Sequence, residues 1–158
     1  MSILVAVLSS PPLTTGERTR ARVDLARELL GFDDVVLVNL IRVATHSTGD
    51  LSQVGRDLGV WLEARPAIAE AVAVADAALL GYGCTPPIGP ARQHFKAQEN
   101  WLAGLLDRLG VEVIMVGGQP RHPSRWQRWT SRRYPDIAFS EALRLHFLQT
   151  NATSDAAS

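Results

Sequence analysis

Four short apolar runs, separated by longer segments with helical spacing, constrain the fold of this chain more than any other feature. The runs are Ile3–Leu8, Val35–Asn39, Ala77–Leu80 and Val111–Val116. A short run of Ile, Val and Leu without polar alternation is typical of a strand buried on both faces of a parallel sheet. Strands that alternate with helices favour such a sheet with helices on both sides. We therefore predict an α/β fold, a three-layer αβα sandwich around a central four-stranded parallel sheet.

The segments between the runs supply the helices. Apolar residues recur there at helical spacing, Pro66 can open one helix, and Gly31 and Gly110 are natural C-terminal stops for two others. The predicted helices are Thr15–Leu30, Ala67–Ala75, Ala91–Leu109 and Ser140–Leu148. The stretch Arg42–Gly59 lacks this pattern, and we interpret it as a long functional loop with one helical turn.

The length of 158 residues fits a single domain, predicted for residues 1–150, followed by a disordered tail, residues 151–158. The first apolar run is too short to span a membrane, and no basic region of a signal peptide precedes it. We therefore expect a cytoplasmic protein with no membrane partner. Cys84 is the single cysteine, which excludes an internal disulfide and a zinc or iron–sulfur site built from several cysteines. The histidines show no metal-binding spacing, so we expect no metal and no cofactor.

The formal net charge is zero, so binding to nucleic acid would depend on a local patch. The dense basic patch of the chain is residues 121–133, where arginines interleave with tryptophans. Arginines beside aromatic rings suit a ligand with phosphates and flat rings. We interpret this segment as a basic loop in which Arg121, Arg125, Arg128 and Trp126 contact DNA. The alternative is a solvated face whose tryptophans pack onto the sheet.

Polar residues, or glycines that allow unusual backbone angles, follow all four predicted strands. Right-handed crossovers place the strand ends at one edge of a parallel sheet, and ligands bind beyond this carboxyl edge. The residues expected there include Ser10-Pro11, Asn39, Tyr82-Gly83 and His122-Pro123-Ser124. The sequence therefore predicts a shared ligand site.

Each of these polar residues has a functional and a structural interpretation. Asn39 can read the hydrogen-bonding edge of a pyrimidine, or it can cap the strand end. His122 can donate a hydrogen bond to a carbonyl or leaving oxyanion, or it can be an exposed loop histidine. Ser124 can bind phosphate or cap a following helix, and Ser10 can hold a water or initiate a turn.

The order of these motifs resembles the uracil-DNA glycosylase superfamily. There the first motif contains Asp-Pro or Asn-Pro, the second strand can end in a base-reading Asn, the third ends near Trp-Gly, and the last motif is His-Pro-Ser. The residues that match are Ser10-Pro11, Asn39, Tyr82-Gly83 and His122-Pro123-Ser124. The chain is more similar still to a family of small bacterial and phage proteins described only as a domain of unknown function. That similarity covers roughly Ile3 to Arg125 and has the pattern LNPS, VNLF, WG and PRHP.

The resemblance implies hydrolysis of the N-glycosidic bond of a uracil-like or modified base in DNA or in a nucleotide. It implies that Asn39, Tyr82 and Pro11 hold the base, that His122 stabilises the leaving base and that Ser10 holds the water. The implied phosphate and DNA contacts are Ser124, Arg121, Arg125, Arg128 and Trp126.

Ser10 stands where the superfamily has the acid or amide that orients the attacking water, and Glu17 and Asp24 are candidates to replace it. Two other functions therefore stay open. One is a non-catalytic nucleic-acid or nucleotide-binding module on the same fold. The other is an enzyme acting on a small phosphorylated metabolite.

Overall fold

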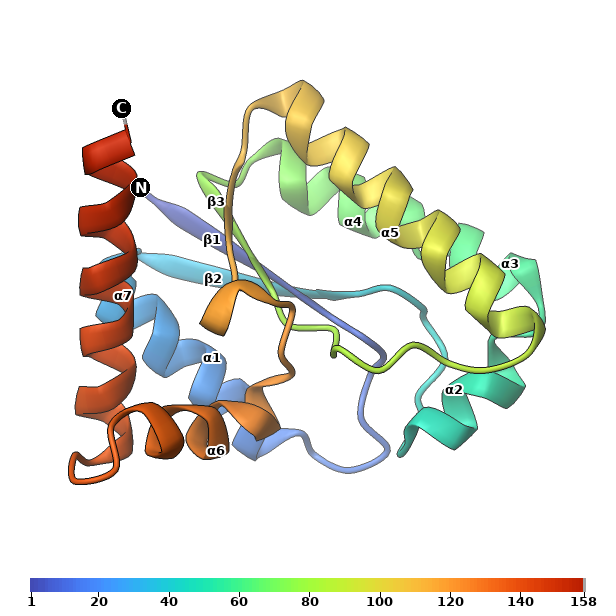
Figure 1. The fold of residues 1–158 in the computed structure, drawn as a ribbon. Helices are drawn as coiled ribbons and strands as arrows, with labels where there is room; N and C mark the ends of the chain where they lie inside the picture. Colours follow the sequence, from blue (N-terminus) through green and yellow to red (C-terminus); the bar gives the residue numbers. More distant parts are fainter. Residues whose placement is uncertain (158) are drawn as a thin grey trace.

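The computed structural model describes the backbone of residues 1–157 and the side chains of residues 1–151. It confirms the predicted α/β fold, with four parallel strands between two layers of helices (Figure 1). The strands are β1 (Ile3–Leu8), β2 (Asp34–Asn39), β3 (Ala77–Leu80) and β4 (Glu112–Ile114), in the order β2-β1-β3-β4. The chain runs from β1 to β2 on one side and then returns to β3 on the other side of β1. The carboxyl ends of β1 and β3 therefore flank the topological switch point, where ligands bind in open α/β sheets.

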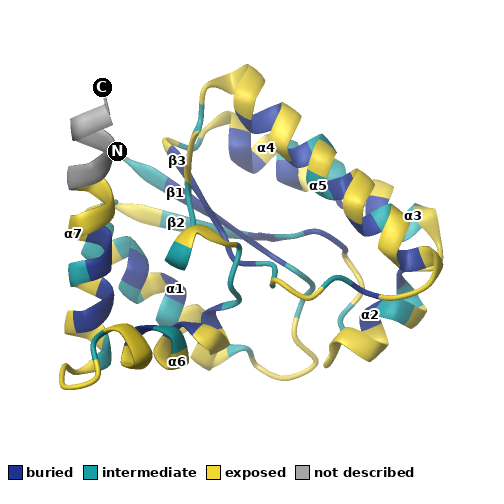
Figure 2. Ribbon diagram, in the orientation of Figure 1, coloured by how far each residue is buried: buried dark blue, intermediate teal, exposed yellow. Residues whose placement is uncertain are grey.

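Two helical layers cover the sheet (Figure 1). One face carries α1 (Glu17–Leu30), α6 (Pro123–Arg133) and α7 (Phe139–Ala157). The other face carries α2 (Thr48–Val54), α3 (Leu58–Leu62), α4 (Arg65–Ala73) and α5 (Pro90–Leu109). Alternate side chains of β1 enter the two cores: Leu4 packs with the first layer, and Val5 and Val7 pack with the second. The central strands are consequently buried on both faces, as the apolar runs predict (Figure 2).

The stretch Arg42–Gly59 contains more helix than the expected loop with one turn, because local side chains cap it. The Ser47 hydroxyl accepts a hydrogen bond from the Asp50 backbone N–H at 3.2 Å, and the Asp50 carboxylate accepts one from the His46 N–H at 3.0 Å. This reciprocal pairing satisfies two backbone donors at the start of α2. The Asp57 carboxylate starts α3 in a similar way by accepting a hydrogen bond from the Gly59 N–H.

The fourth strand is shorter than the predicted Val111–Val116, and it is not buried. It lies at the edge of the sheet, and the Val113 side chain is 43% exposed. The chain then makes a 3₁₀ turn in which Gly117 has a φ of 72°. A Cβ atom at Gly117 would lie 2.6 Å from the Trp129 ring, so this close approach requires glycine.

The basic segment that we interpreted as a loop is helix α6. The imidazole of His122 caps it, and Pro123 occupies its first position, where a missing N–H costs nothing. The final helix, α7, begins at Phe139 and runs to Ala157, beyond the predicted end at Leu148. The predicted tail, residues 151–158, lies almost entirely outside the residues whose side chains the structure describes.

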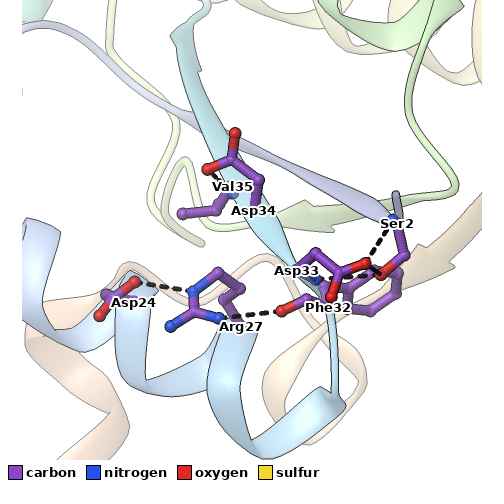
Figure 3. A network of polar contacts seen from close by, with 7 residues as sticks. All are labelled: Ser2, Asp24, Arg27, Phe32, Asp33, Asp34 and Val35. Carbon is purple, nitrogen blue, oxygen red and sulfur yellow. Dashed lines mark hydrogen bonds and ion pairs between the residues drawn. The ribbon is translucent and has the colours of Figure 1, made fainter.

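A polar network closes the opposite, amino edge of the sheet (Figure 3). The Asp33 carboxylate accepts hydrogen bonds from the Ser2 backbone N–H at 2.8 Å and from the Ser2 hydroxyl at 3.1 Å. Arg27, in the last turn of α1, pairs with Asp24 at 2.8 Å and donates to the Phe32 carbonyl at 2.9 Å. These contacts fix where β1 and β2 begin, and they engage the Asp24 carboxylate with Arg27.

Among the described residues, we find no helix with the length and apolar character that crossing a membrane requires.

Candidate functional site

A cleft of about 930 Å³ lies at the carboxyl edge of the sheet. Its walls come from the loops after β1, β2 and β3, the start of α1, and α6 with the segment before it. The loop after β1 runs along the lower part of Figure 1 between α6 and α2. Every site residue named from the sequence lines this cleft except Trp126. Those that do are Ser10, Pro11, Asn39, Tyr82, Arg121, His122, Ser124, Arg125 and Arg128.

Backbone hydrogen bonds hold the loops of the cleft in fixed positions. The pairing of β1 with β2 continues past the strands, with Leu40 N–H donating to the Leu8 carbonyl at 2.9 Å and Thr45 N–H donating to the Pro11 carbonyl at 3.1 Å. On the other side of β1, Gly83 N–H donates to the carbonyl of Pro120 at 2.7 Å. Backbone hydrogen bonds therefore connect the loops that carry the site residues to one another, as they connect neighbouring strands in the sheet.

Gln98 supports this wall from inside the protein. Its buried amide N–H₂ donates to the carbonyls of Leu40 at 2.9 Å and Trp61 at 2.8 Å, and its amide oxygen accepts from Arg65 at 2.9 Å. The first of these carbonyls directly follows Asn39. Gln98 therefore fixes the backbone next to the proposed base-reading residue.

The Ser10 hydroxyl forms a hydrogen bond with the Thr45 hydroxyl, so a pair of hydroxyl groups occupies the position of the first motif. None of the described side chains that line the cleft is acidic. Neither Glu17 nor Asp24 is among the lining residues, and Asp24 is paired with Arg27. Neither of these two candidates for the first-motif acid therefore lines the cleft.

His122 has a defined tautomer because it caps α6. Its Nδ1 accepts a hydrogen bond from the Ser124 backbone N–H at 3.1 Å and lies 2.9 Å from the Ser124 hydroxyl. Burial, followed by the charges of Arg125 and Arg22, lowers the pKa of His122 below its usual value. The ring is thus neutral near pH 7, and its proton is on Nε2. Among the described residues, no partner occupies Nε2, so this atom can donate a hydrogen bond to a ligand.

The side chains expected to hold a base differ in how they are anchored. The Asn39 amide forms no hydrogen bond with the described residues and is available to a ligand. Tyr82 is fixed: its hydroxyl donates to Glu99 at 2.8 Å, and its ring packs edge-on against Phe95 at 5.8 Å. Burial, reinforced by the hydrogen bond to Glu99, raises the pKa of Tyr82. Tyr82 therefore presents a rigid, uncharged ring at the wall of the cleft.

Arginines dominate the electrostatics of the cleft. The lining arginines, which we call the arginine array, are Arg20, Arg121, Arg125, Arg128 and Arg132. Within the described residues none of them forms a salt bridge, since the two pairs found are Arg27–Asp24 and Arg144–Glu141. Arg20 was not recognised from the sequence, although a basic residue near the start of a helix that follows a strand end is a usable signal. Arg132 belongs to the basic segment, residues 121–133, but is not among the site residues predicted from the sequence.

Arg22 positions the start of α6. It donates to the Pro123 carbonyl at 2.7 Å and to the Gln127 side chain at 3.1 Å, and its guanidinium lies over the Phe139 ring at 5.4 Å. These contacts tie α6 to α1 and α7. They hold the His122 backbone in place without bringing Arg22 into the lining of the cleft.

The prediction that Trp126 contacts DNA is wrong. The Trp126 side chain is completely buried in the core against α1 and α7, and its indole N–H donates to the Arg121 carbonyl at 2.9 Å. Trp129 lines the cleft instead. The guanidinium groups of Arg121 and Arg133 each lie 5.7 Å from the centroid of its ring.

The fold and the site together define a parallel α/β sandwich with a cationic cleft at its topological switch point. Comparisons of the chain with protein-family models, with curated proteins and with solved structures find no match. The relation to the glycosylase superfamily therefore stays a prediction that rests on the motif residues.

Proposed function

We propose that the cleft binds a nucleotide, either free or as one nucleotide of DNA. The observation that carries this proposal is the arginine array, five cationic side chains that line one cleft with no acidic side chain among the lining residues described. Guanidinium groups form paired, charge-assisted hydrogen bonds with phosphate oxygens. A cytoplasmic location belongs to the same proposal.

The lining of the cleft also suits the base of a nucleotide. Asn39 offers an amide that can donate and accept side by side, and Tyr82 lines the cleft with an aromatic ring that its hydrogen bond to Glu99 holds in place. Hydroxyl groups of Ser10 and Thr45 lie in the same lining and can bind a sugar. A simple anion would use the arginines alone, whereas a nucleotide would use both groups of residues.

Titration with nucleoside monophosphates and with the matching nucleosides tests the proposal. Trp129 lines the cleft, so its fluorescence should report binding. Since hydrogen bonds to charged groups contribute about 1.5–3 kcal/mol and exposure weakens them, we expect Arg125→Ala to lower the affinity for a monophosphate about fivefold. Arg92→Ala, which removes an exposed arginine of α5 outside the cleft, is the matched control. Equal effects of the two substitutions, or no binding of any nucleotide, would contradict the proposal.

Hydrolysis of an N-glycosidic bond is a second candidate function, and the state of His122 favours it. When the bond between the base and the sugar breaks, its electron pair stays with the base. Water adds to the sugar carbon, and the proton that this water loses ends on the leaving base. The neutral Nε2–H of His122 can donate to the base oxygen that gains negative charge, and one such donor can contribute about 3–4 kcal/mol. Ser10 and Thr45 can hold the water, but neither supplies the negative charge of a carboxylate.

Release of free base from uracil-containing DNA, modified-base DNA and nucleotides tests this second candidate. His122→Asn is the informative variant, because asparagine keeps a helix cap and removes the Nε2 donor. If the chain hydrolyses the bond, the native chain releases base and the variant loses about a hundredfold to a thousandfold in rate. Tight binding without any release would leave the chain as a binding module.

A further inference from the structure

We infer that the ligand of the cleft carries two or more linked phosphate groups, as a nucleoside diphosphate or triphosphate does. This inference deepens the proposed function and rests on it. It starts from the arginine array, which contains more guanidinium groups, spread over a longer distance, than a single phosphate group can contact.

Three members of the arginine array form a stripe along α6. Arg125, Arg128 and Arg132 are spaced three and four residues apart, which places them on one face of the helix. With a rise of about 1.5 Å per residue, the stripe is about 10 Å long, so it extends past the reach of one phosphate group. Arg20 and Arg121 add cations from α1 and from the segment before α6.

The charge of the array also matches a multiply phosphorylated ligand. A single phosphate monoester brings at most about two negative charges at neutral pH. Since the described residues provide no salt-bridge partner to any of the five arginines, such a ligand would leave most of them unneutralised. A chain of phosphates along the stripe would neutralise successive arginines.

The distribution of charge over the protein favours a short ligand over a long strand of nucleic acid. The sequence has 16 basic and 16 acidic residues, not counting histidine. With five of the basic residues in the cleft, eleven basic and sixteen acidic residues remain for the rest of the chain, a net charge of −5. The rest of the chain therefore carries no net positive charge to attract a strand that continues beyond the cleft, whereas a nucleoside polyphosphate ends inside the cleft.

A titration series with one base tests the inference: nucleoside, monophosphate, diphosphate, triphosphate and a short single-stranded oligonucleotide, each with and without Mg²⁺. We expect the affinity to rise with each added phosphate, reaching at least tenfold between monophosphate and triphosphate, and to fall more steeply with salt for the triphosphate. Equal affinities for monophosphate and triphosphate would overturn the inference and leave the proposed function intact. An oligonucleotide that binds more tightly than the triphosphate would overturn it in favour of a nucleic-acid strand. Absence of binding by every compound would remove the proposed function itself.

Two substitutions locate the effect. Arg132→Ala removes the last arginine of the stripe, and we expect it to weaken triphosphate binding at least fivefold while monophosphate binding changes less than twofold. Arg18→Ala is the matched control, because Arg18 is exposed on α1 and does not line the cleft. An equal loss for both nucleotides in Arg132→Ala, or an equal effect of Arg18→Ala, would contradict the placement of the additional phosphates along α6.

Discussion

His122 combines a structural and a ligand-facing role, and substitution can separate them. Its Nδ1 caps α6 by accepting the Ser124 N–H at 3.1 Å, whereas its Nε2 has no partner among the described residues. Loss of an N-terminal cap costs about 1 kcal/mol, within a range of about 0.5–2 kcal/mol. For a domain of this size, 1 kcal/mol corresponds to a fall of about 2–4 °C in the midpoint of thermal unfolding. We therefore expect His122→Ala to unfold about 2–4 °C below the native chain.

His122→Asn should behave differently, because asparagine is among the strongest capping residues and its side-chain oxygen can accept the same N–H. We expect its unfolding midpoint to stay within about 1 °C of the native value. Ligand affinity should fall in both variants, since neither keeps a donor at the Nε2 position. Calorimetric unfolding and fluorescence titration measure the two effects independently. If Ala and Asn at this position gave the same unfolding midpoint, the cap would contribute nothing and the assigned tautomer would lose its support.

Three further predictions concern the support of the cleft. Gln98→Leu leaves the buried Leu40 carbonyl without the Gln98 donor, whereas the Trp61 carbonyl keeps the Ala64 N–H as a donor. Urea unfolding should therefore show a loss of about 1–3 kcal/mol. Gln93→Leu on the exposed face of α5 should change stability by less than about 0.5 kcal/mol. Tyr82→Phe removes one hydrogen bond and keeps the ring, so the free energy of unfolding should fall by about 1 kcal/mol. Nucleotide affinity should change less than about twofold. A large loss of affinity would show that the hydroxyl itself contacts the ligand. Burial lowers the pKa of both His122 and His146 in the folded protein, so the unfolded chain binds more protons just below the unfolded pKa of about 6.5. Stability should therefore fall as the pH drops from about 7 to about 5, and urea unfolding at several pH values would refute this if stability rose instead.

The sheet could be predicted from the sequence because burial on both faces leaves a simple pattern. The run Ile3–Leu8 is β1 with the same bounds, and Ala77–Leu80 is β3. The predicted fourth strand, Val111–Val116, is longer than the observed strand. Hydrophobic content does not distinguish an edge strand from a central one, and Gly117 turns the chain after the short strand. Capped short helices such as α2 were missed because their stability depends on a few side-chain contacts, here Ser47 with Asp50, and not on an apolar face.

The basic segment shows why the same residues can suggest two structures. Interleaved arginines and tryptophans suggested a loop that presents both kinds of side chain to DNA. In helix α6 the same residues lie on two different faces. Trp126 and Thr130 are buried, while Arg125 and Arg128 are exposed. A count of the spacing, with arginines three and four apart and Pro123 after a capping residue, would have indicated the helix. This separation assigns the arginines to the ligand and Trp126 to the core.

The residues that line the cleft suit binding of an anionic ligand better than they suit hydrolysis of a glycosidic bond. Binding of an anionic ligand requires only unneutralised arginines and fixed polar groups, and the described lining provides both. Hydrolysis of a glycosidic bond develops positive charge on the sugar, which a carboxylate stabilises and five guanidinium groups oppose. The Ser10 and Thr45 hydroxyls can orient water but cannot offset that repulsion. The phosphates of the ligand would have to supply the negative charge near the sugar, so any hydrolysis by this cleft should be faster on nucleotides than on nucleosides.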